Sequence, residues 1–481
     1  MPAAAAPPRL ACVSTQLPRS RPSEQGVDPR ALRRFVEAVD SDPDIELHSV
    51  MVLRHGHVVA EGWWAPHTPE RARLVYSVSK SFTSSALGFA LAEGLVSLDD
   101  TLLSYFPELD AEVSHPWSRD IRLRHLASMT TGHDRDLLDE VIALDAREPV
   151  RGLLLIPPDR EPGTLFAYSQ PSTYALAAVI QRVTGVPLSH YLRPRLFDPL
   201  GIGEVWWQSW PRGRELGFSG IFVRTEDIAK LGQLYLQRGR WNGVQLLSEE
   251  YVAEATSRHI DTPAQDNVDW QQGYGFQFWM ARHGYRGDGA FGQFCVVLPE
   301  LDAVVATTGG TEAMQAVLDH LWTELLPGLE ATQPDETAEP ELKRRLAALR
   351  LSACEGKPTP SDLRVDADLT VSQPSAMDAV LLRVDAGGIE LTLTQSDNAI
   401  TFPARIQDWL ISSPTDRKGD PVPVAASAGW QDDETLRVEV LFLETAHRMD
   451  VVCTLRTRSA EATWRTTPLD GGALATLHRP V

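Results

Sequence analysis

The texture of the chain changes near residue 350, and this change restricts the folds that the sequence can adopt. From about residue 352 onward, short runs of β-forming residues follow one another, with turn signals between them. They read AVLLRVD, GIELTLT, AITFPARI, TLRVEVLFLE and MDVVCTLRT. Short strands at such spacing are typical of an antiparallel barrel or sandwich. The sequence therefore predicts a C-terminal antiparallel β-barrel domain over residues 352–481.

Helices and strands are mixed before residue 330. The predicted order is strand, helices, strand and helix, which indicates one sheet with helices around it. The predicted segments are a hairpin at 48–64 that turns at His55 and Gly56, helices at 77–94, 122–128, 172–184 and 225–239, strands within 292–310, and a closing helix at 314–329. Gly185 and Gly239 are expected to end two of the helices, and Thr225 to cap the start of one.

The 481 residues are too many for one ordinary domain. The predicted parts are a flexible N-terminal lead-in at 1–24, a mixed helix-and-sheet domain at 25–330, a linker with a short charged helix at 331–351, and the β domain at 352–481.

Charge and composition exclude several classes of partner. Lys plus Arg total 45 and Asp plus Glu total 65, so the formal charge is −20, which repels nucleic acid and acidic lipid surfaces. The N-terminus lacks the apolar run of a signal peptide and no stretch approaches a membrane helix, so a cytoplasmic location is expected. The four cysteines form no CxxC and the thirteen histidines no HExxH, so neither a disulfide framework nor a metal site is predicted.

One short motif carries chemistry. Ser77 stands three residues before Lys80 at the start of a predicted helix, so the two side chains share one helix face. The first turn of a helix offers free backbone N–H groups, and a desolvated lysine can hold a neutral amine beside the hydroxyl. Ser77 and Lys80 are thus a candidate nucleophile and base. The alternative is an ordinary helix start with a solvated lysine, but the small apolar residues after Lys80 favour a buried helix.

Such a pair needs a further proton-transfer group and backbone N–H groups that stabilise an oxyanion. Tyr168 follows a Pro-Gly turn and precedes a predicted helix, and residues 287–293 form a glycine-rich strand edge. The segments SVSKSF, FAYSQ before STYALAAVIQRVTG, and GAFGQ before LPELD occur in this order. Together they resemble the serine β-lactamase and penicillin-binding-protein superfamily, most closely its class C β-lactamase-like branch, over about residues 25–330.

The resemblance implies an α+β fold, with an antiparallel sheet flanked by helices and a helical subdomain. The C-terminal barrel resembles the lipocalin-like domain that some relatives carry. Carried over by position, Ser77 matches the acylated nucleophile, Lys80 the lysine that activates it, and Tyr168 the tyrosine that protonates the leaving group. The resemblance places the oxyanion-hole N–H groups at Ser77 and Ala290.

Two positions depart from the pattern of the family. Gln170 stands where asparagine is usual, and Gly287-Asp288-Gly289 stands where relatives have Lys-Thr-Gly or His-x-Gly. The cation that helps to bind a substrate carboxylate is therefore missing at Gly287, and Arg286 and His283 are candidate replacements. The residues carried over as substrate-binding candidates are Gln170, Gly287, Gly289 and Gln293.

Other signals are interpreted as structural. Gly287, Gly289 and Gly292 spell GxGxxG, but a predicted strand follows where a dinucleotide site needs a helix. His125 and His133 are interpreted as structural or surface residues. The aromatic cluster at 206–210 is interpreted as packing, with a pocket wall for an apolar group as the alternative.

The expected function is that of a serine hydrolase acting on small-molecule esters or amides through an acyl-enzyme, with no metal or organic cofactor. The missing cation argues against a strong β-lactamase or a DD-peptidase that grips a carboxylate. A D-amino-acid-specific peptidase or peptide-cyclising thioesterase using the same site stays open, and so does a catalytically inactive binding module. The barrel is expected to shape the substrate entrance or to drive oligomerisation, so a homo-oligomer also stays open.

Overall fold

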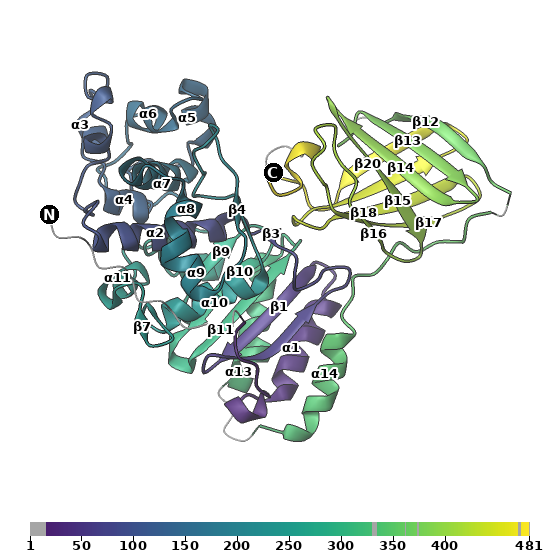
Figure 1. Ribbon diagram of the computed structural model, residues 1–481, viewed down its shortest axis with the longest axis horizontal. Helices are drawn as coiled ribbons and strands as arrows, with labels where there is room; N and C mark the ends of the chain where they lie inside the picture. The colour runs from purple at the N-terminus through teal and green to yellow at the C-terminus, as the bar shows by residue number, and fades with distance from the viewer. Residues whose placement is uncertain (1–15, 330–333, 361, 373–374, 470–472, 481) are drawn as a thin grey trace.

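A computed structural model describes residues 16–329, 334–360, 362–372, 375–469 and 473–480. A six-stranded antiparallel sheet lies at the centre of the N-terminal part, in the strand order β2-β1-β11-β10-β9-β8 (Figure 1). Its strands are β1 (Leu47–Arg54), β2 (His57–Trp63), β8 (Trp279–Met280), β9 (Tyr285–Gly289), β10 (Gln293–Leu298) and β11 (Ala303–Gly309). The predicted hairpin and the predicted strands within 292–310 are confirmed.

The sheet is buried on both faces because its strands carry apolar residues at successive positions. In β1, Met51 and Leu53 belong to one hydrophobic core, whereas Val50 and Val52 belong to a second core on the opposite face. This is the period-two alternation of a strand with both faces covered. Both cores must therefore be supplied by helices, one layer on each side.

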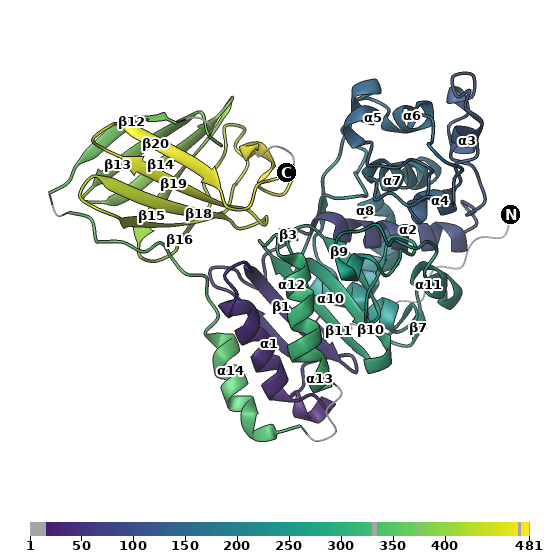
Figure 2. The ribbon, with the colours of Figure 1, turned by 180° about the vertical axis from the view of Figure 1, so that it is seen from behind.

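Helix α10 (Thr225–Leu236) covers one face of the sheet, in contact with β1, β10 and β11 (Figure 1). Figure 2 shows α1 (Pro29–Ser41), α12 (Met314–His320) and α13 (Leu326–Leu329) on the opposite face. Thr225 is not the N-cap that the sequence predicted. It is the first helical residue, Arg224 occupies the N-cap, and the Thr225 hydroxyl is hydrogen-bonded to Ser49.

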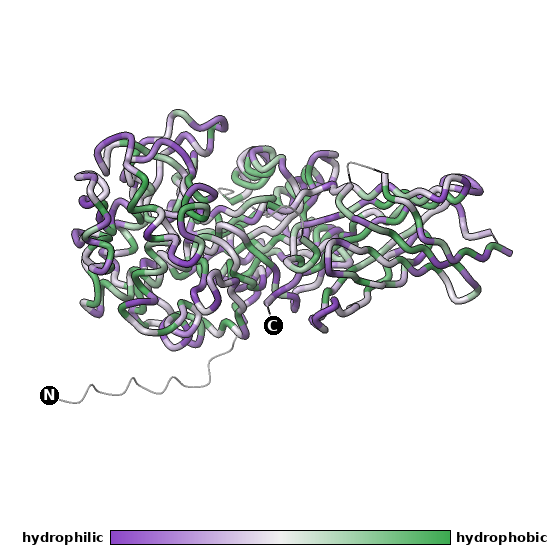
Figure 3. Tube along the Cα trace, turned by 90° about the horizontal axis from the view of Figure 1, so that it is seen from above, coloured by the Kyte–Doolittle hydropathy of each residue, from purple (hydrophilic) through white to green (hydrophobic). Residues whose placement is uncertain are grey.

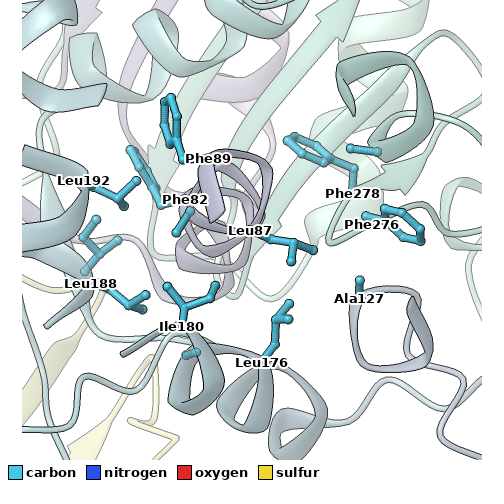
Figure 4. Packing of buried hydrophobic residues seen from close by; sticks show 14 of the residues in the cluster. Phe82, Leu87, Phe89, Ala127, Leu176, Ile180, Leu188, Leu192, Phe276 and Phe278 are labelled. Atoms are coloured by element: carbon cyan, nitrogen blue, oxygen red, sulfur yellow. The ribbon is translucent and has the colours of Figure 1, made fainter. Parts of the chain in front are cut away.

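A helical subdomain is packed around α2 (Ser79–Ala92), whose residues are buried as far as Ala90. Figure 4 shows Leu176 and Ile180 of α7 (Gln170–Thr184) pointing toward α2. Gly185 ends α7 in the left-handed conformation, as predicted. The other helices of this part are α3 (Pro116–Arg119), α4 (Leu123–Ala127), α5 (Leu138–Leu144), α6 (Pro149–Leu155), α8 (Leu188–Leu192), α9 (Asp198–Leu200) and α11 (Glu249–Ala255).

The C-terminal part is a β-barrel, as predicted. Eight strands close it, and the short strand β16 (Leu410–Ser412) is added at β17. The eight strands are β12 (Val365–Val371), β13 (Ala379–Asp385), β14 (Gly388–Gln395), β15 (Asn398–Ile406), β17 (Val424–Trp430), β18 (Thr435–Phe442), β19 (Arg448–Thr454) and β20 (Ser459–Trp464). Neighbours pair antiparallel except at two junctions, β12 with β20 and β15 with β17, which are parallel. Polar and apolar residues alternate along much of the barrel (Figure 3), as the buried and exposed positions of β13 require.

Two segments outside the central sheet, the helical subdomain and the barrel make more contacts with the rest of the protein than the sequence predicted. Residues 18–20 of the predicted flexible lead-in exchange backbone hydrogen bonds with Val58 of β2, while residues 1–15 lie outside the described ranges. The charged helix α14 (Glu339–Ala347) packs against α1 and β2 and buries Leu342. The division of the chain into four parts stays a prediction. Within the described ranges, no helix combines the length and the apolar character that crossing a membrane requires.

Candidate active site

Ser77 and Lys80 meet as the sequence predicted. Ser77 lies in a short 3₁₀ turn, η2 (Tyr76–Val78), directly before α2, and Lys80 is in the first turn of that helix. The Lys80 Nζ atom lies 2.8 Å from Ser77 Oγ. Lys80 is fully buried and Ser77 is half-buried, so the serine hydroxyl stays accessible while the amine beneath it does not.

Three acceptors surround the Lys80 amine. Besides Ser77 Oγ, these are Gln170 Oε1 at 2.6 Å and the Phe218 carbonyl oxygen at 2.9 Å. A neutral amine has two N–H groups and one lone pair. When the N–H groups donate to Gln170 and Phe218, the lone pair faces the Ser77 hydroxyl, which is the arrangement that a general base needs.

Burial favours the neutral form of the Lys80 amine near physiological pH. Desolvation lowers the pKa of Lys80 to about 7, although the negative charges of Asp136 and Asp288 act in the opposite direction. Lysine has an ordinary pKa above 10, so this side chain is one of the strongly shifted groups of the molecule. Perturbed titratable groups in a pocket are frequent at active sites.

Tyr168 covers the Lys80 amine from the side. Lys80 Nζ lies 4.7 Å from the centroid of the Tyr168 ring, and the ring stacks on Trp279 at 5.3 Å between centroids. Burial raises the pKa of Tyr168 above its usual range, and hydrogen bonding toward Ser77 offsets this only in part. Tyr168 therefore keeps its proton at neutral pH, and its hydroxyl can serve as a proton donor.

Gln170, the first departure from the family pattern, is the residue that orients Lys80. Its side chain accepts from Lys80, and its backbone N–H donates to Asp136 Oδ1 at 3.0 Å. Since Gln170 begins α7, Asp136 satisfies one of the free N–H groups at the start of that helix. Neither Asp136 nor the Phe218 carbonyl was predicted from the sequence, because folding alone brings these positions to Lys80.

The end of strand β9 lies directly against the turn that carries Ser77. A Cβ atom added at Gly289 would come within 2.3 Å of the Val75 carbonyl oxygen, so only glycine allows this approach. Ala290 follows Gly289 in the chain and packs against the hydrophobic cluster that includes Tyr76, the residue before Ser77. Gln293 does not reach the pocket. Its buried amide donates to the carbonyl oxygens of Ala290, Phe291 and Gly309, so it holds the β9–β10 turn.

The presence of glycine at position 287 also has a steric explanation. A Cβ atom there would lie 2.8 Å from Ser81 Oγ, so β9 packs on α2 with no space for a side chain. Neither predicted replacement supplies a free cation. Arg286 is fully buried, pairs with Asp288 at 2.9 Å and stacks on Trp270, while His283 is exposed and packs against Trp322.

Asp288 adds a second carboxyl group beside the site. It is buried, and desolvation raises its pKa to about 6, even though Arg286 pulls the pKa down. Its charge is felt by both Lys80 and Tyr168. The segment Gly287-Asp288-Gly289 is therefore electrically neutral or negative, whereas relatives carry a cation at its first position.

A cavity of about 680 Å³ opens on Ser77, and the barrel supplies part of its wall. Leu138 and Ile142 of α5, Gln208 after β4 (Trp206–Trp207), and Phe218 line the side formed by the N-terminal part. The barrel contributes His447, Pro468, Leu469, Thr476 and Leu477. The C-terminal turns of the barrel face the helical subdomain in Figure 1. The predicted role of the barrel in shaping the entrance thus has a structural basis in these lining residues.

His125 and His133, interpreted from the sequence as structural or surface residues, are not among the residues that line the cavity. His133 is buried between the Thr131 hydroxyl and the Ile156 carbonyl oxygen, and His125 accepts from the Arg122 N–H at the start of α4. Strand β10 follows the GxGxxG segment, which excludes a dinucleotide loop there. Of the cluster at 206–210, Gln208 lines the cavity and the Trp206 ring packs under the guanidinium of Arg479.

Comparison with known proteins agrees with this architecture. Over 186 residues the chain is 31% identical to a lovastatin esterase of Penicillium rubens, an alignment that covers 34% of this chain and 46% of the relative. Over 290 residues it is 26% identical to a 6-aminohexanoate-dimer hydrolase of Paenarthrobacter ureafaciens, covering 53% and 70%. The chain thus spans less than half the length of the lovastatin esterase that it matches.

A similar fold occurs in a solved structure from Bacillus anthracis, provisionally assigned as a 6-aminohexanoate-dimer hydrolase. The two share a TM-score of 0.53 at 18% identity, over 66% of this chain and 88% of that one. The family model described as Beta-lactamase matches residues 32–319, which is more than half of the chain. The match includes the serine, the lysine, the tyrosine and strand β9 described above, and the chain therefore belongs to the beta-lactamase family.

Proposed function

We propose that the protein is a serine hydrolase that acts on small esters or amides through an acyl-enzyme at Ser77. One observation carries the proposal: the Lys80 amine lies 2.8 Å from the Ser77 hydroxyl, in a buried setting that lowers the lysine pKa to about 7. A neutral amine in this position can take the serine proton as the hydroxyl attacks a carbonyl. The names of the relatives, a lovastatin esterase and a 6-aminohexanoate-dimer hydrolase, support a hydrolase.

In the proposed acylation, Ser77 Oγ attacks the substrate carbonyl carbon while Lys80 Nζ takes the hydroxyl proton. The N–H groups of Ser77 and Ala290 stabilise the negative oxygen of the tetrahedral intermediate. Tyr168, which its raised pKa keeps protonated, passes its proton to the leaving alcohol or amine and regains one from Lys80. Water then attacks the acyl group on Ser77, and the same residues act in reverse order.

The charge of the pocket favours substrates without a carboxylate near the scissile bond. Asp136, Asp139 and Glu140 line the cavity, and none of its described lining residues is Lys or Arg. Glu140 pairs with Arg135 at 3.0 Å, so Asp136 and Asp139 dominate the local charge. A substrate carboxylate would be repelled here, whereas a neutral or cationic group would be accepted.

A covalent-labelling experiment tests the nucleophile. A fluorophosphonate should add its mass to the wild-type protein and to Ser104→Ala, in which an exposed serine outside the cavity is removed. Ser77→Ala should show no added mass. A folded wild-type protein that forms no adduct would rule out the hydrolase and favour the inactive binding module.

A matched series of p-nitrophenyl esters tests the substrate class. Butyrate, 4-aminobutyrate and hemisuccinate differ mainly in the charge at the end of the acyl chain. We expect kcat/KM for the hemisuccinate to be about 10-fold or more below that for the butyrate, because its carboxylate would meet the carboxylates of Asp136 and Asp139 in the cavity wall. In Asp139→Asn the difference in kcat/KM between the hemisuccinate and the butyrate should become smaller. Equal rates for the three esters would contradict the assignment.

The acidic residues of the cavity wall also favour acyl transfer to an amine as a second candidate reaction. Asp136 and Asp139 would raise the local concentration of an amine, as a peptidase run in reverse or a cyclising thioesterase requires. The ratio of amide to acid products in the presence of butylamine measures this partition. A ratio no higher than that of the uncatalysed ester would exclude it.

A further inference from the structure

The two N–H groups assigned to the oxyanion hole each adjoin a residue with an unusual backbone. Tyr76 precedes Ser77 and has a φ of 47°, and Phe291 follows Ala290 with a φ of 66°. Residues with a Cβ rarely adopt this left-handed conformation, and bulky aromatic residues least of all. Surrounding contacts must therefore hold Tyr76 and Phe291 in place, and with them the directions of the adjoining peptide groups.

One side chain of the C-terminal barrel touches both residues. The His447 ring lies 5.3 Å from the Phe291 ring and 6.0 Å from the Tyr76 ring, in each case edge to face. The Tyr76 and Phe291 rings pack edge to face on each other at 5.2 Å. The Tyr76 hydroxyl is also hydrogen-bonded to His447 Nε2. The three rings form one cluster that spans the boundary between the barrel and the site.

His447 is itself fixed by the barrel. Its Nδ1 lies 2.9 Å from the Thr466 carbonyl oxygen, and a carbonyl can only accept, so the neutral ring carries its proton on Nδ1. The Nε2 atom then has the lone pair and accepts the hydrogen bond from Tyr76. Both ring nitrogens thus have defined roles, and the ring cannot rotate without losing them.

The barrel segment around His447 is docked firmly beside the nucleophile. In β3 (Arg73–Leu74), the Leu74 N–H donates to the Glu444 carbonyl oxygen at 2.8 Å. On the other side, Thr466 Oγ1 donates to the Gly310 carbonyl oxygen at 2.9 Å. A Cβ atom at Gly310 would come within 2.6 Å of the Ala446 carbonyl oxygen, so the surfaces approach to backbone contact.

Resting on the hydrolase proposed above, we propose that His447 is a positioning residue for the oxyanion hole. It clamps Tyr76 and Phe291 from the barrel and so fixes the N–H groups of Ser77 and Ala290. The barrel is thereby a working part of the active site and not only a wall of its entrance. His447 acts through Tyr76 and Phe291, so its effect is expected in the stabilisation of the transition state.

The test compares His447→Ala with His447→Gln and Thr466→Val. The alanine variant removes the ring and the hydrogen bond, and we expect kcat for p-nitrophenyl butyrate to fall about 10- to 100-fold with KM changed less than about 2-fold. Glutamine can still accept from Tyr76 and should recover part of the loss. Thr466→Val weakens the same interface through the Gly310 contact, leaves the clamp intact, and should keep kcat within about 2-fold of wild type.

Affinity for a transition-state analogue separates positioning from a general structural role. A trifluoromethyl ketone forms an oxyanion on the serine, whereas the matching secondary alcohol forms none. In His447→Ala the affinity for the ketone should fall in parallel with kcat, while the affinity for the alcohol stays near the wild-type value. Equal losses for both ligands, or an equal loss in Thr466→Val, would overturn the proposal.

A second variant covers the case in which His447→Ala does not fold. Tyr76→Phe keeps the ring contacts and removes the hydrogen bond from the other side, so kcat should fall several-fold with the same small effect on KM. An unchanged kcat in folded Tyr76→Phe and His447→Gln would overturn the proposal. A wild-type protein that the fluorophosphonate does not label would instead overturn the proposed function, so the two failures are distinguishable.

Discussion

Gln170 Oε1 accepts a hydrogen bond from Lys80 Nζ at 2.6 Å, at the position where relatives usually carry asparagine. The longer side chain reaches the lysine from the first residue of α7, while its backbone N–H is held by Asp136. The departure from the family pattern is therefore compatible with a working site. The side chain at position 170 is thus in direct contact with the Lys80 amine, so a charge placed there should change the pKa of Lys80.

Replacing Gln170 by glutamate should make Lys80 a poorer base at neutral pH. A carboxylate beside the amine favours the ammonium form, so the pKa of Lys80 should rise above its value of about 7. The pH at which kcat/KM reaches half of its alkaline plateau should move upward by the same amount. Gln271→Glu, which adds a carboxylate at an exposed position, should leave the profile unchanged. A Gln170→Glu profile identical to that of the wild type would mean that Lys80 is not the base.

Removing the charge of Asp136 should have the opposite effect. The negative charge of Asp136 raises the pKa of Lys80, and asparagine can still accept from the Gln170 N–H. In Asp136→Asn the rise of kcat/KM with pH should therefore begin at lower pH, because the neutral amine becomes populated earlier. Stopped-flow acylation by p-nitrophenyl butyrate between pH 5 and 9 measures the shift. A shift to higher pH would refute the electrostatic account.

Local sequence patterns carried the outline of this fold and the first two residues of the site. Glycine signals both the hairpin turn at His55 and Gly56 and the helix end at Gly185. The backbone at these three residues is left-handed, a conformation that favours glycine. Ser77 and Lys80 lie one helical turn apart, so their contact follows from helix geometry. These features could be predicted because each is determined within a few residues.

The remaining contacts of the site could not be predicted from such patterns because the residues that make them are far apart in the sequence. The Phe218 carbonyl oxygen that binds Lys80 lies 138 residues away in sequence, and the contact from Tyr76 to His447 spans 371 residues. The start of α10 was predicted one residue too late because Asp227, not a Thr225 side chain, accepts the N–H at the helix entrance. Tertiary packing decides such cases.

Restoring the family cation at Gly287 should destabilise the protein and not create a carboxylate-binding site. In Gly287→Lys the new Cβ atom would lie 2.8 Å from Ser81 Oγ, so β9 or α2 has to move. We expect a loss of about 1–3 kcal/mol in the free energy of unfolding, as for other overpacked cores. Gly203→Lys, where a Cβ atom meets nothing within 4 Å, should cost less than about 0.5 kcal/mol. Normal stability together with turnover of the hemisuccinate ester would show that Gly287 is not sterically required.

Acid should weaken the protein through a buried histidine at the boundary with the barrel. His48 Nε2 donates to Glu46 at 3.0 Å, while its Nδ1 accepts from the Arg73 guanidinium, which also binds the Thr445 carbonyl oxygen of the barrel. Burial, assisted by the Arg73 charge, lowers the pKa of His48 from 6.5 to about 4. Nδ1 cannot gain a proton without losing its bond to Arg73.

The sign of the pH effect follows from that lowered pKa. The unfolded chain binds a proton on His48 below pH 6.5, whereas the folded chain does not do so until about pH 4, so stability is lost as the pH falls through this window. The full loss is about 3 kcal/mol, of which about 2 kcal/mol should appear between pH 7.5 and pH 5. Glutamine at position 48 can keep both hydrogen bonds without titrating. Urea unfolding at the two pH values should therefore show a smaller drop for His48→Gln than for the wild type, whereas His190→Gln at an exposed site should follow the wild type. An equal drop in all three proteins would assign the acid sensitivity to other groups.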